Sequence, residues 1–214
     1  AYVDIDAHHA DGVAEGFGGD PQTLLISVHE QDRWPRTGAI DEVGVGNMIN
    51  VPMPKGCNDD EMGLVLSEVI VPAVAAFAPD AIVLQCGADA VLEDPQSRMA
   101  LSNNAHWAVV AALRDMSPRY LVMGGGGYNP WSVGRLWAGV WATLNRCEIP
   151  DVLPPEASDI LRALRWKGPM GEKFAQGHWV TTLRDAPRGG LISQDVRGRV
   201  AQIVARLPLA SAGR

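Results

Sequence analysis

The sequence predicts an α/β fold built on a mostly parallel sheet, and three observations lead to that prediction. Continuous apolar runs of strand length occur at residues 81–86 and 120–123, and such runs are typical of parallel strands that are covered on both faces. Stretches of strand composition are followed by loops and then by stretches of helical composition. Three strands end in polar or glycine-rich motifs, at residues 6–11, 86–94 and 124–129. Because ligand sites in parallel sheets lie beyond the carboxyl ends of the strands, we expect these motifs to form one functional site.

The first half of the chain reads as three strands, a long loop and a helix. Residues 2–7 alternate as a strand and end in a polar turn, residues 23–28 form a second strand, and a short strand lies near residues 47–51. The region 30–58 around that short strand is rich in Gly, Pro and Asp, and its length indicates a functional loop. Acidic residues in a first turn favour a helix over residues 58–77, in which Pro72 should introduce a kink.

The second half begins with the two apolar runs, which we expect to be buried strands. A helix over residues 102–115 separates them, and another over 132–144 follows the glycine-rich motif. After a Pro-rich turn at 151–155, we expect helices at 157–166 and 194–207, whereas residues 168–193 have no assignable structure or role. The chain therefore divides into residues 1–150 and a helical extension of the same domain, residues 151–214.

Length and composition limit the classes of function. The 214 residues suffice for one sizeable domain, and 47% hydrophobic residues suffice for a normal core. The net charge of −7 argues against nucleic acid as a partner. No apolar stretch approaches 18 residues, which argues against a membrane partner. Three widely spaced cysteines without a CxxC motif suit a reducing compartment, so we expect a cytoplasmic protein.

A cluster of acidic residues and histidine follows the first strand. In a strand, residues two apart share a face, so Asp4, Asp6 and His8 would point the same way. Carboxylate and imidazole on one face are ligands for a divalent metal, although a polar strand end with capping residues would read the same. Asp89, which follows the apolar strand and Gly87, is either a turn cap or a third ligand. Asp6, His8 and Asp89 together would give the ligand count of an open, catalytic metal site.

The glycine run 124–127 precedes Tyr128 and Asn129. It lacks the GK[ST] and GxGxxG patterns of phosphate-binding loops. Four glycines allow positive φ angles and close approach of the backbone to a ligand, and a tyrosine presented there can donate a hydrogen bond to an oxyanion. The alternative is a tight strand-to-helix turn against which Tyr128 packs.

Taken together, the motifs YVDIDAHHADGV, QCGAD followed by EDP, and GGGGYN resemble the zinc-dependent histone deacetylase family, in the same order and spacing over about residues 1–150. The segment SRMALSNNAHW, residues 97–107, is more similar to bacterial acetoin-utilisation deacetylases such as AcuC. The resemblance implies an arginase-like, three-layer α/β/α fold. Because the chain starts within a strand, we expect it to be the C-terminal part of that catalytic domain, with the N-terminal part missing.

The resemblance also implies roles for individual residues. The expected metal ligands, for zinc or alternatively ferrous iron, are Asp6, His8 and Asp89. Tyr128 would polarise the acetamide carbonyl, and Asp4 and Asp11 would orient two catalytic histidines. A structural potassium ion would be bound by Asp4, by backbone oxygens of Asp6 and His8, and by Ser27 and Val28. The expected walls of the acyl-lysine tunnel are Trp34, Pro35, Gly126 and Gly127.

The sequence departs from the family at the catalytic histidines. In the family a His-His pair, the general base and acid, lies upstream of the first zinc-ligand motif, and only residues 1–3 precede that motif here. No other histidine replaces the pair; the remaining ones are His9, His29, His106 and His178. We therefore expect a deacetylase of N-acetyl-lysine-type acetamides, acting on an acetylated protein or a small acetylated amine, of which this fragment alone is inactive. The alternatives are an acetylpolyamine amidohydrolase, a non-catalytic module that binds metal or acyl-amines, and a scaffold without metal.

Overall fold

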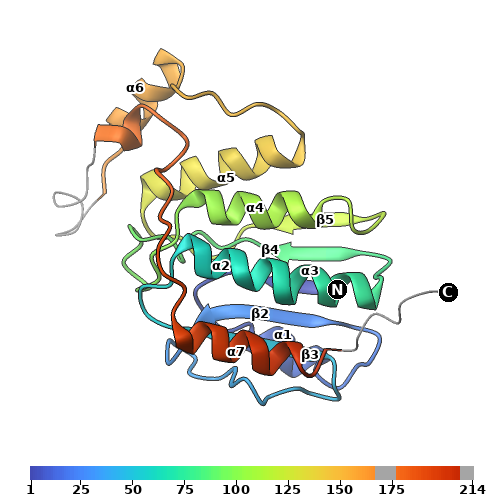
Figure 1. Ribbon diagram of the computed structural model, residues 1–214. Coiled ribbons are helices and arrows are strands. Elements are labelled where there is room, and N and C mark those ends of the chain that lie inside the picture. Colours follow the sequence, from blue (N-terminus) through green and yellow to red (C-terminus); the bar gives the residue numbers. More distant parts are fainter. Residues whose placement is uncertain (167–176, 208–214) are drawn as a thin grey trace.

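A single parallel sheet forms the centre of the chain (Figure 1). The computed structural model describes residues 1–166 and 177–207. Five strands pair in the order β3-β2-β1-β4-β5, and every pairing is parallel. The strands are β1 (Tyr2–Asp4), β2 (Leu25–Glu30), β3 (Met48–Met53), β4 (Ile82–Gln85) and β5 (Tyr120–Met123). The predicted α/β fold with a parallel sheet is confirmed.

The register of the sheet determines where the polar motifs meet. Asp4, the last residue of β1, lies opposite Ser27 of β2 and Gln85 of β4, and Gln85 lies opposite Met123 of β5. The segments that follow β1, β4 and β5 therefore leave the sheet at one edge. This edge is formed by the carboxyl ends of parallel strands, where ligand sites are expected.

Helices cover the sheet. In Figure 1, α7 (Gln194–Val204), α2 (Asp59–Val65) with α3 (Val71–Phe77), and α4 (Asn103–Leu113) lie side by side in front of the strands. α5 (Pro130–Leu144) packs on α4, and α1 (Asp11–Phe17) packs on β2 behind the sheet. α6 (Pro155–Ala163) and the short 3₁₀ helix Gly177–Val180 extend beyond α5. Residues 167–176 and 208–214 of the predicted extension lie outside the described residues.

Capping side chains explain where several helices begin. Asn58 accepts hydrogen bonds from the backbone of Asp60 and Glu61, and the Glu61 carboxylate accepts one from the Asn58 backbone in return. Ser102 and Ser193 cap α4 and α7 in the same position. The irregularity predicted at Pro72 takes the form of a π-helical turn, Leu66–Ile70, directly before α3. A proline has no backbone N–H to donate. It is tolerated there because the regular i to i−4 hydrogen bonds of the helix are already interrupted by the π-helical turn.

The structure differs from the predicted elements in several places; the helix predicted at 157–166, for example, spans Pro155–Ala163. β1 ends at Asp4 rather than at residue 7, because the chain turns there and the Asp4 carboxylate accepts the backbone N–H of Asp6 at 3.0 Å. α1 was not predicted, since it is short and buries no side chain, and so leaves no apolar stripe. β5 has the predicted bounds but forms an edge of the sheet, where Leu121 is 56% exposed.

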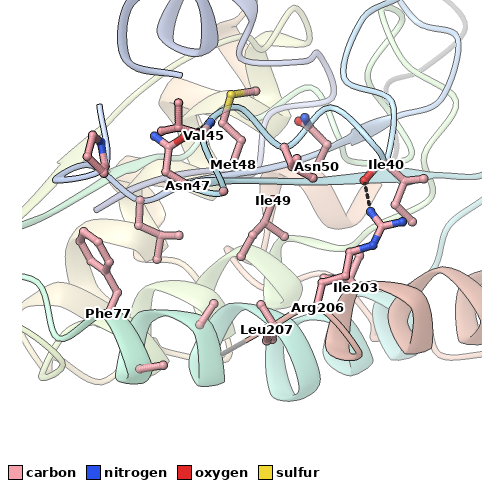
Figure 2. Close-up of a pocket in the computed structure, with 16 residues that line it drawn as sticks. Ile40, Val45, Asn47, Met48, Ile49, Asn50, Phe77, Ile203, Arg206 and Leu207 are labelled. Atoms are coloured by element: carbon pink, nitrogen blue, oxygen red, sulfur yellow. Dashed lines mark hydrogen bonds between the residues drawn. The ribbon is translucent and has the colours of Figure 1, made fainter. Parts of the chain in front are cut away.

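A largely apolar cavity lies away from the polar edge. Its volume is about 410 Å³, and it opens between β3, α3 and α7 (Figure 2). Ile49 of β3 faces Phe77 and Leu207 across it, and Arg206 donates a hydrogen bond to the carbonyl of Ile40 at 3.1 Å.

In the part of the chain that the structure describes, no helix is both long and apolar enough to cross a membrane.

Candidate metal centre

The side chains of Asp6, His8 and Asp89 converge on one point beyond β1 and β4. His8 Nδ1 lies 2.9 Å from Asp6 Oδ1 and 3.0 Å from Asp89 Oδ2. One ligand atom from each residue lies within 4.8 Å of the other two. Asp6 and His8 belong to the turn after β1 and not to the strand itself. The turn therefore brings Asp6 and His8 together, although the spacing of two suggested a strand face, and the pairing of β1 with β4 brings Asp89 to them.

Hydrogen bonds from the surrounding backbone fix both carboxylates. Asp6 Oδ2 accepts the side-chain amide of Gln85 at 3.0 Å and the backbone N–H of Gly126 at 2.9 Å. Asp89 Oδ1 accepts the backbone N–H of Ala7 at 2.8 Å. Among the described residues, Asp89 Oδ2 is buried without a hydrogen-bond donor of its own, and the imidazole shared with Asp6 lies 3.0 Å from it. One oxygen of each carboxylate thus remains directed at the common point.

The electrostatics of the three groups favour a bound cation. Hydrogen bonds to Asp6 and Asp89 raise the pKa of His8 to about 10. Burial raises the pKa of Asp89, whereas for Asp6 hydrogen bonds from His8 and Gln85 outweigh burial and lower the pKa below its usual range. A positive charge between two buried carboxylates stabilises them, and a divalent metal supplies more charge than one proton. Two carboxylate oxygens and one imidazole nitrogen form a donor set suited to zinc with an open coordination position.

Glycine is required at two positions around the carboxylates. A Cβ atom on Gly87 would lie 2.0 Å from Asp6 Oδ2, and one on Gly126 would lie 2.0 Å from Asp89 Oδ2. At Gly127 the φ angle of +141° adds a conformation that other residues rarely adopt. The glycine-rich motif therefore lets the backbone after β5 approach the carboxylates closely.

The three side chains open into a cavity of about 370 Å³. Tyr128, 49% exposed, and Trp34, 70% exposed, contribute to its wall, and the Trp34 ring centroid lies 6.4 Å from that of His8. Burial and the nearby carboxylates of Asp89 and Asp6 raise the pKa of Tyr128. Of the four predicted tunnel residues, the structure places Trp34 and Gly126 on this wall; the described lining does not include Pro35 or Gly127.

Asp4 and Asp11 also line this cavity, in different environments. Asp4 is buried, accepts the Tyr2 hydroxyl at 2.9 Å, and has a pKa that burial raises to about 7. Asp11 is exposed at the start of α1. Ser27 and Val28, the further residues predicted to bind potassium, lie buried in β2, where Ser27 Oγ is 3.0 Å from Nδ1 of His29. The potassium site stays a prediction.

Three other histidines have protein partners. His9 Nδ1 lies 2.8 Å from Thr37 Oγ1, and its ring centroid lies 4.9 Å from that of His29. His29 Nε2 is 3.0 Å from the carbonyl oxygen of Gly38, and burial lowers the pKa of His29 to about 4. His106 Nε2 is 2.9 Å from the carbonyl oxygen of Gly87. These contacts are structural.

The sequence analysis missed two polar residues beside the site. Gln85 donates to Asp6 Oδ2 and accepts the backbone N–H of Gly87 at 2.7 Å, so it joins the segments after β1 and β4. Asp94 accepts the backbone N–H of Tyr128 at 2.6 Å. Gln85 carried one usable signal, a polar residue at the end of an apolar strand.

The chain is similar in sequence and in fold to known proteins. The chain matches a family model described as the histone deacetylase domain over residues 1–144. The putative histone deacetylase 2 of Caenorhabditis elegans is 36% identical over 158 residues, which are 72% of this chain and 31% of that protein. A solved HDAC homolog from Aquifex aeolicus has a TM-score of 0.86 at 31% identity, with 95% of this chain and 56% of that chain covered. An HDAC homolog complexed with SAHA has a TM-score of 0.87 at the same identity and coverage.

The chain spans about a third of the length of the curated relatives it matches and 56% of the solved homologues. The family model nevertheless matches well over half of this chain, and the solved homologues share its fold over nearly all of it. The chain therefore belongs to the histone deacetylase family.

Proposed function

We propose that this chain carries the metal centre of a deacetylase that hydrolyses N-acetyl-lysine-type acetamides. The observation that carries the proposal is the convergence of Asp6, His8 and Asp89 beside Tyr128 in one cavity, in a chain of a family of deacetylase hydrolases. The donor set favours zinc, with ferrous iron as the alternative. The SRMALSNNAHW segment supports a relationship to acetoin-utilisation deacetylases of the AcuC type. An acetylated protein and a small acetylated amine, including an acetylpolyamine, are both substrates of the proposed chemistry.

Each residue of the site has a task in this proposal. Asp6, His8 and Asp89 hold the metal, which when bound acts as a Lewis acid toward water and the acetyl carbonyl. The Tyr128 hydroxyl donates a hydrogen bond to the oxygen of that carbonyl as negative charge develops there. A phenol is protonated at neutral pH, and burial with the nearby carboxylates raises the pKa of Tyr128 further, so the donor is present. Trp34 lines the route by which the aliphatic part of the substrate enters.

Proton transfer requires groups beyond these. Asp4 and Asp11 lie on the cavity wall, where they would orient the imidazoles of the family's His-His pair. Because that pair is not among the histidines of this sequence, we propose that residues 1–150 supply the C-terminal part of the catalytic domain and that residues 151–214 extend it. Potassium bound near Asp4, Asp6, His8, Ser27 and Val28 would be structural. The three free cysteines support a cytoplasmic location.

The test is an acetyl-lysine peptide assay on the zinc-loaded, full-length protein. Tyr128→Phe should lower kcat about 10²–10³-fold with little change in KM, because a donor used in the transition state is lost. Asp89→Asn should abolish both stoichiometric zinc binding and activity. The matched control is Gly134→Ala, which adds a methyl group on an exposed face of α5 where nothing lies within 4 Å. Full activity of either site variant would contradict the proposal.

A non-catalytic module is the second candidate, and it is favoured by the absence of a replacement for the His-His pair. The two candidates differ in the turnover expected of the full-length protein, whereas both predict an inactive fragment. Zinc-loaded residues 1–214 should show no appreciable turnover beside the full-length protein, since general acid–base groups contribute about 10²–10⁴-fold. Turnover within tenfold of the full-length protein would show that this chain holds its own proton-transfer groups. A full-length protein that binds zinc but hydrolyses no acetyl-lysine or acetylpolyamine substrate would favour the module.

A further inference from the structure

The loop that carries Tyr128 is attached to its surroundings through the backbone and not through the tyrosine side chain. On one side, the N–H of Gly126 donates to Asp6 Oδ2 at 2.9 Å. At the tyrosine itself, the N–H of Tyr128 donates to Asp94 Oδ2 at 2.6 Å. Among the described residues, none forms a hydrogen bond with the Tyr128 hydroxyl. The direction of the phenol therefore depends on where the backbone at residue 128 is fixed.

Asp94 is a buried carboxylate whose partners are backbone amides. It is 4% exposed, and its second oxygen accepts the N–H of Gln96 at 2.9 Å. Within the described ranges, no Lys, Arg or His forms an ion pair with it. Burying a carboxylate without a cation costs free energy unless strong hydrogen bonds compensate, and the bond from Tyr128 is short and charge-assisted. The carboxylate is thus used to hold the backbone at Tyr128.

The segment around Asp94 is itself firmly anchored. Asn129, which is fully buried, caps α5 and donates its side-chain amide to the carbonyl of Glu93 at 3.2 Å. The Glu93 carboxylate pairs with Arg188, whose guanidinium also donates to the carbonyl of Leu101 at 2.5 Å. Residues 93 and 94 therefore join the loop after β4, the start of α5 and the C-terminal segment. A group anchored in this way can determine the position of a neighbouring loop.

We infer that Asp94 is a positioning residue for Tyr128: its carboxylate, bonded to the tyrosine N–H, fixes the backbone so that the phenol is directed into the metal cavity. This inference rests on the proposed function, because it assigns a task to Tyr128. The glycine run before Tyr128 makes such a restraint necessary. Residues 124–127 carry no side chains that could restrain the loop, and Gly127 adopts φ +141°, which other residues rarely adopt. Without the hydrogen bond, the hydroxyl at the far end of the side chain would sample positions away from the substrate carbonyl.

The first test measures kcat and KM of the zinc-loaded, full-length protein with an acetyl-lysine peptide. Asp94→Ala should lower kcat about 10–10²-fold and leave KM within about threefold, because a misplaced donor weakens the transition state more than binding. Asp94→Asn keeps one acceptor oxygen and should lose less, about 3–10-fold, and it replaces the alanine variant if that one fails to fold. The matched control is Asp20→Ala, which removes another carboxylate that accepts the backbone N–H two residues on, that of Gln22 at 3.0 Å, and that does not line the cavity. An unchanged kcat of both Asp94 variants would overturn the inference.

The second test separates positioning from general stability. In a Tyr128→Phe background, Asp94→Ala should change kcat less than twofold, since the hydroxyl it positions is gone, whereas a merely structural role would give additive losses. Hydrogen exchange of the peptide covering residues 124–129 should accelerate in the Asp94 variants while residues 2–9 are unaffected. Additive losses, or unchanged exchange at 124–129, would overturn the inference. If the parent protein hydrolyses no acetylated substrate, the proposed function fails, and the exchange measurement alone decides whether Asp94 restrains the loop.

Discussion

Replacing Gly126 by alanine should weaken metal binding without unfolding the protein. The added Cβ atom would lie 2.0 Å from Asp89 Oδ2 and 3.0 Å from Asp6 Oδ2. Real Cβ atoms essentially never approach a neighbour closer than 3.0 Å, so the carboxylate or the loop must move by about 1 Å. Metal–ligand distances tolerate only about 0.2 Å. If the loop moves instead, the hydrogen bond from Gly126 N–H to Asp6 is lost. We therefore expect zinc affinity to fall at least about 10–100-fold, the usual loss when the support of a ligand is removed.

The assay is a competition titration of zinc against a chromogenic chelator, on the full-length protein at neutral pH. Gly134→Ala is the matched control, because its methyl group meets open space on α5 and alanine favours a helix by up to about 1 kcal/mol. The metal-free variants should differ little in melting temperature, so that a loss of affinity is not a loss of fold. Zinc affinity of the Gly126 variant within threefold of the parent would refute the reasoning.

Three further predictions concern stability. Asn47→Ala should cost about 2–3 kcal/mol in urea unfolding, because its amide nitrogen lies 2.9 Å from the carbonyl oxygens of Phe17, Asp20 and Thr23, which its two N–H groups share. A cost below about 0.5 kcal/mol would contradict this. Asp185→Asn should cost about 3–5 kcal/mol, since Arg135, 2.7 Å away and 1% exposed, keeps an unpaired charge. The same change at Asp115, in an exposed pair, should cost at most about 1 kcal/mol. Because burial lowers the pKa of His29 from 6.5 to about 4, the unfolded state binds more protons between these pH values. The free energy of unfolding should therefore fall by about 3 kcal/mol as the pH drops through that window, and an unchanged pH dependence in His29→Gln would contradict this.

Local signals determined which elements could be predicted. The apolar run of β5 lies between Arg119 and Gly124, so its bounds were readable, but its place at the sheet edge depends on pairing that no single segment encodes. The start of α2 was predictable because the acidic residues of its first turn follow Asn58 directly. α1 buries no side chain, and therefore the hydrophobic pattern contained nothing to detect.

In the site, too, residues with a local sequence signal were predicted and residues placed by long-range contacts were not. Asp6 and His8 were found from their spacing and from the family resemblance, although the turn that brings them together is not a strand. Gln85 contacts Asp6 across 79 positions of sequence, and Asp94 contacts Tyr128 across 34. Contacts between residues so far apart in the sequence depend on the register of the sheet and on the paths of the loops, which the sequence analysis did not predict. Their side chains alone suggest only a polar strand end and a turn.

The central position of β1 has a consequence for the order in which the chain folds. One edge of β1 pairs with β2, about 20 residues away, but the other must wait for β4, with contacts that span up to 82 positions. Closing so large a loop is slow and entropically costly, so this pairing is a late step of sheet formation. Asp6 and His8 lie in the sequence before the loop that must close, and Asp89 lies after it. The time at which a refolding chain binds metal would therefore mark the time at which the two halves of the sheet pair.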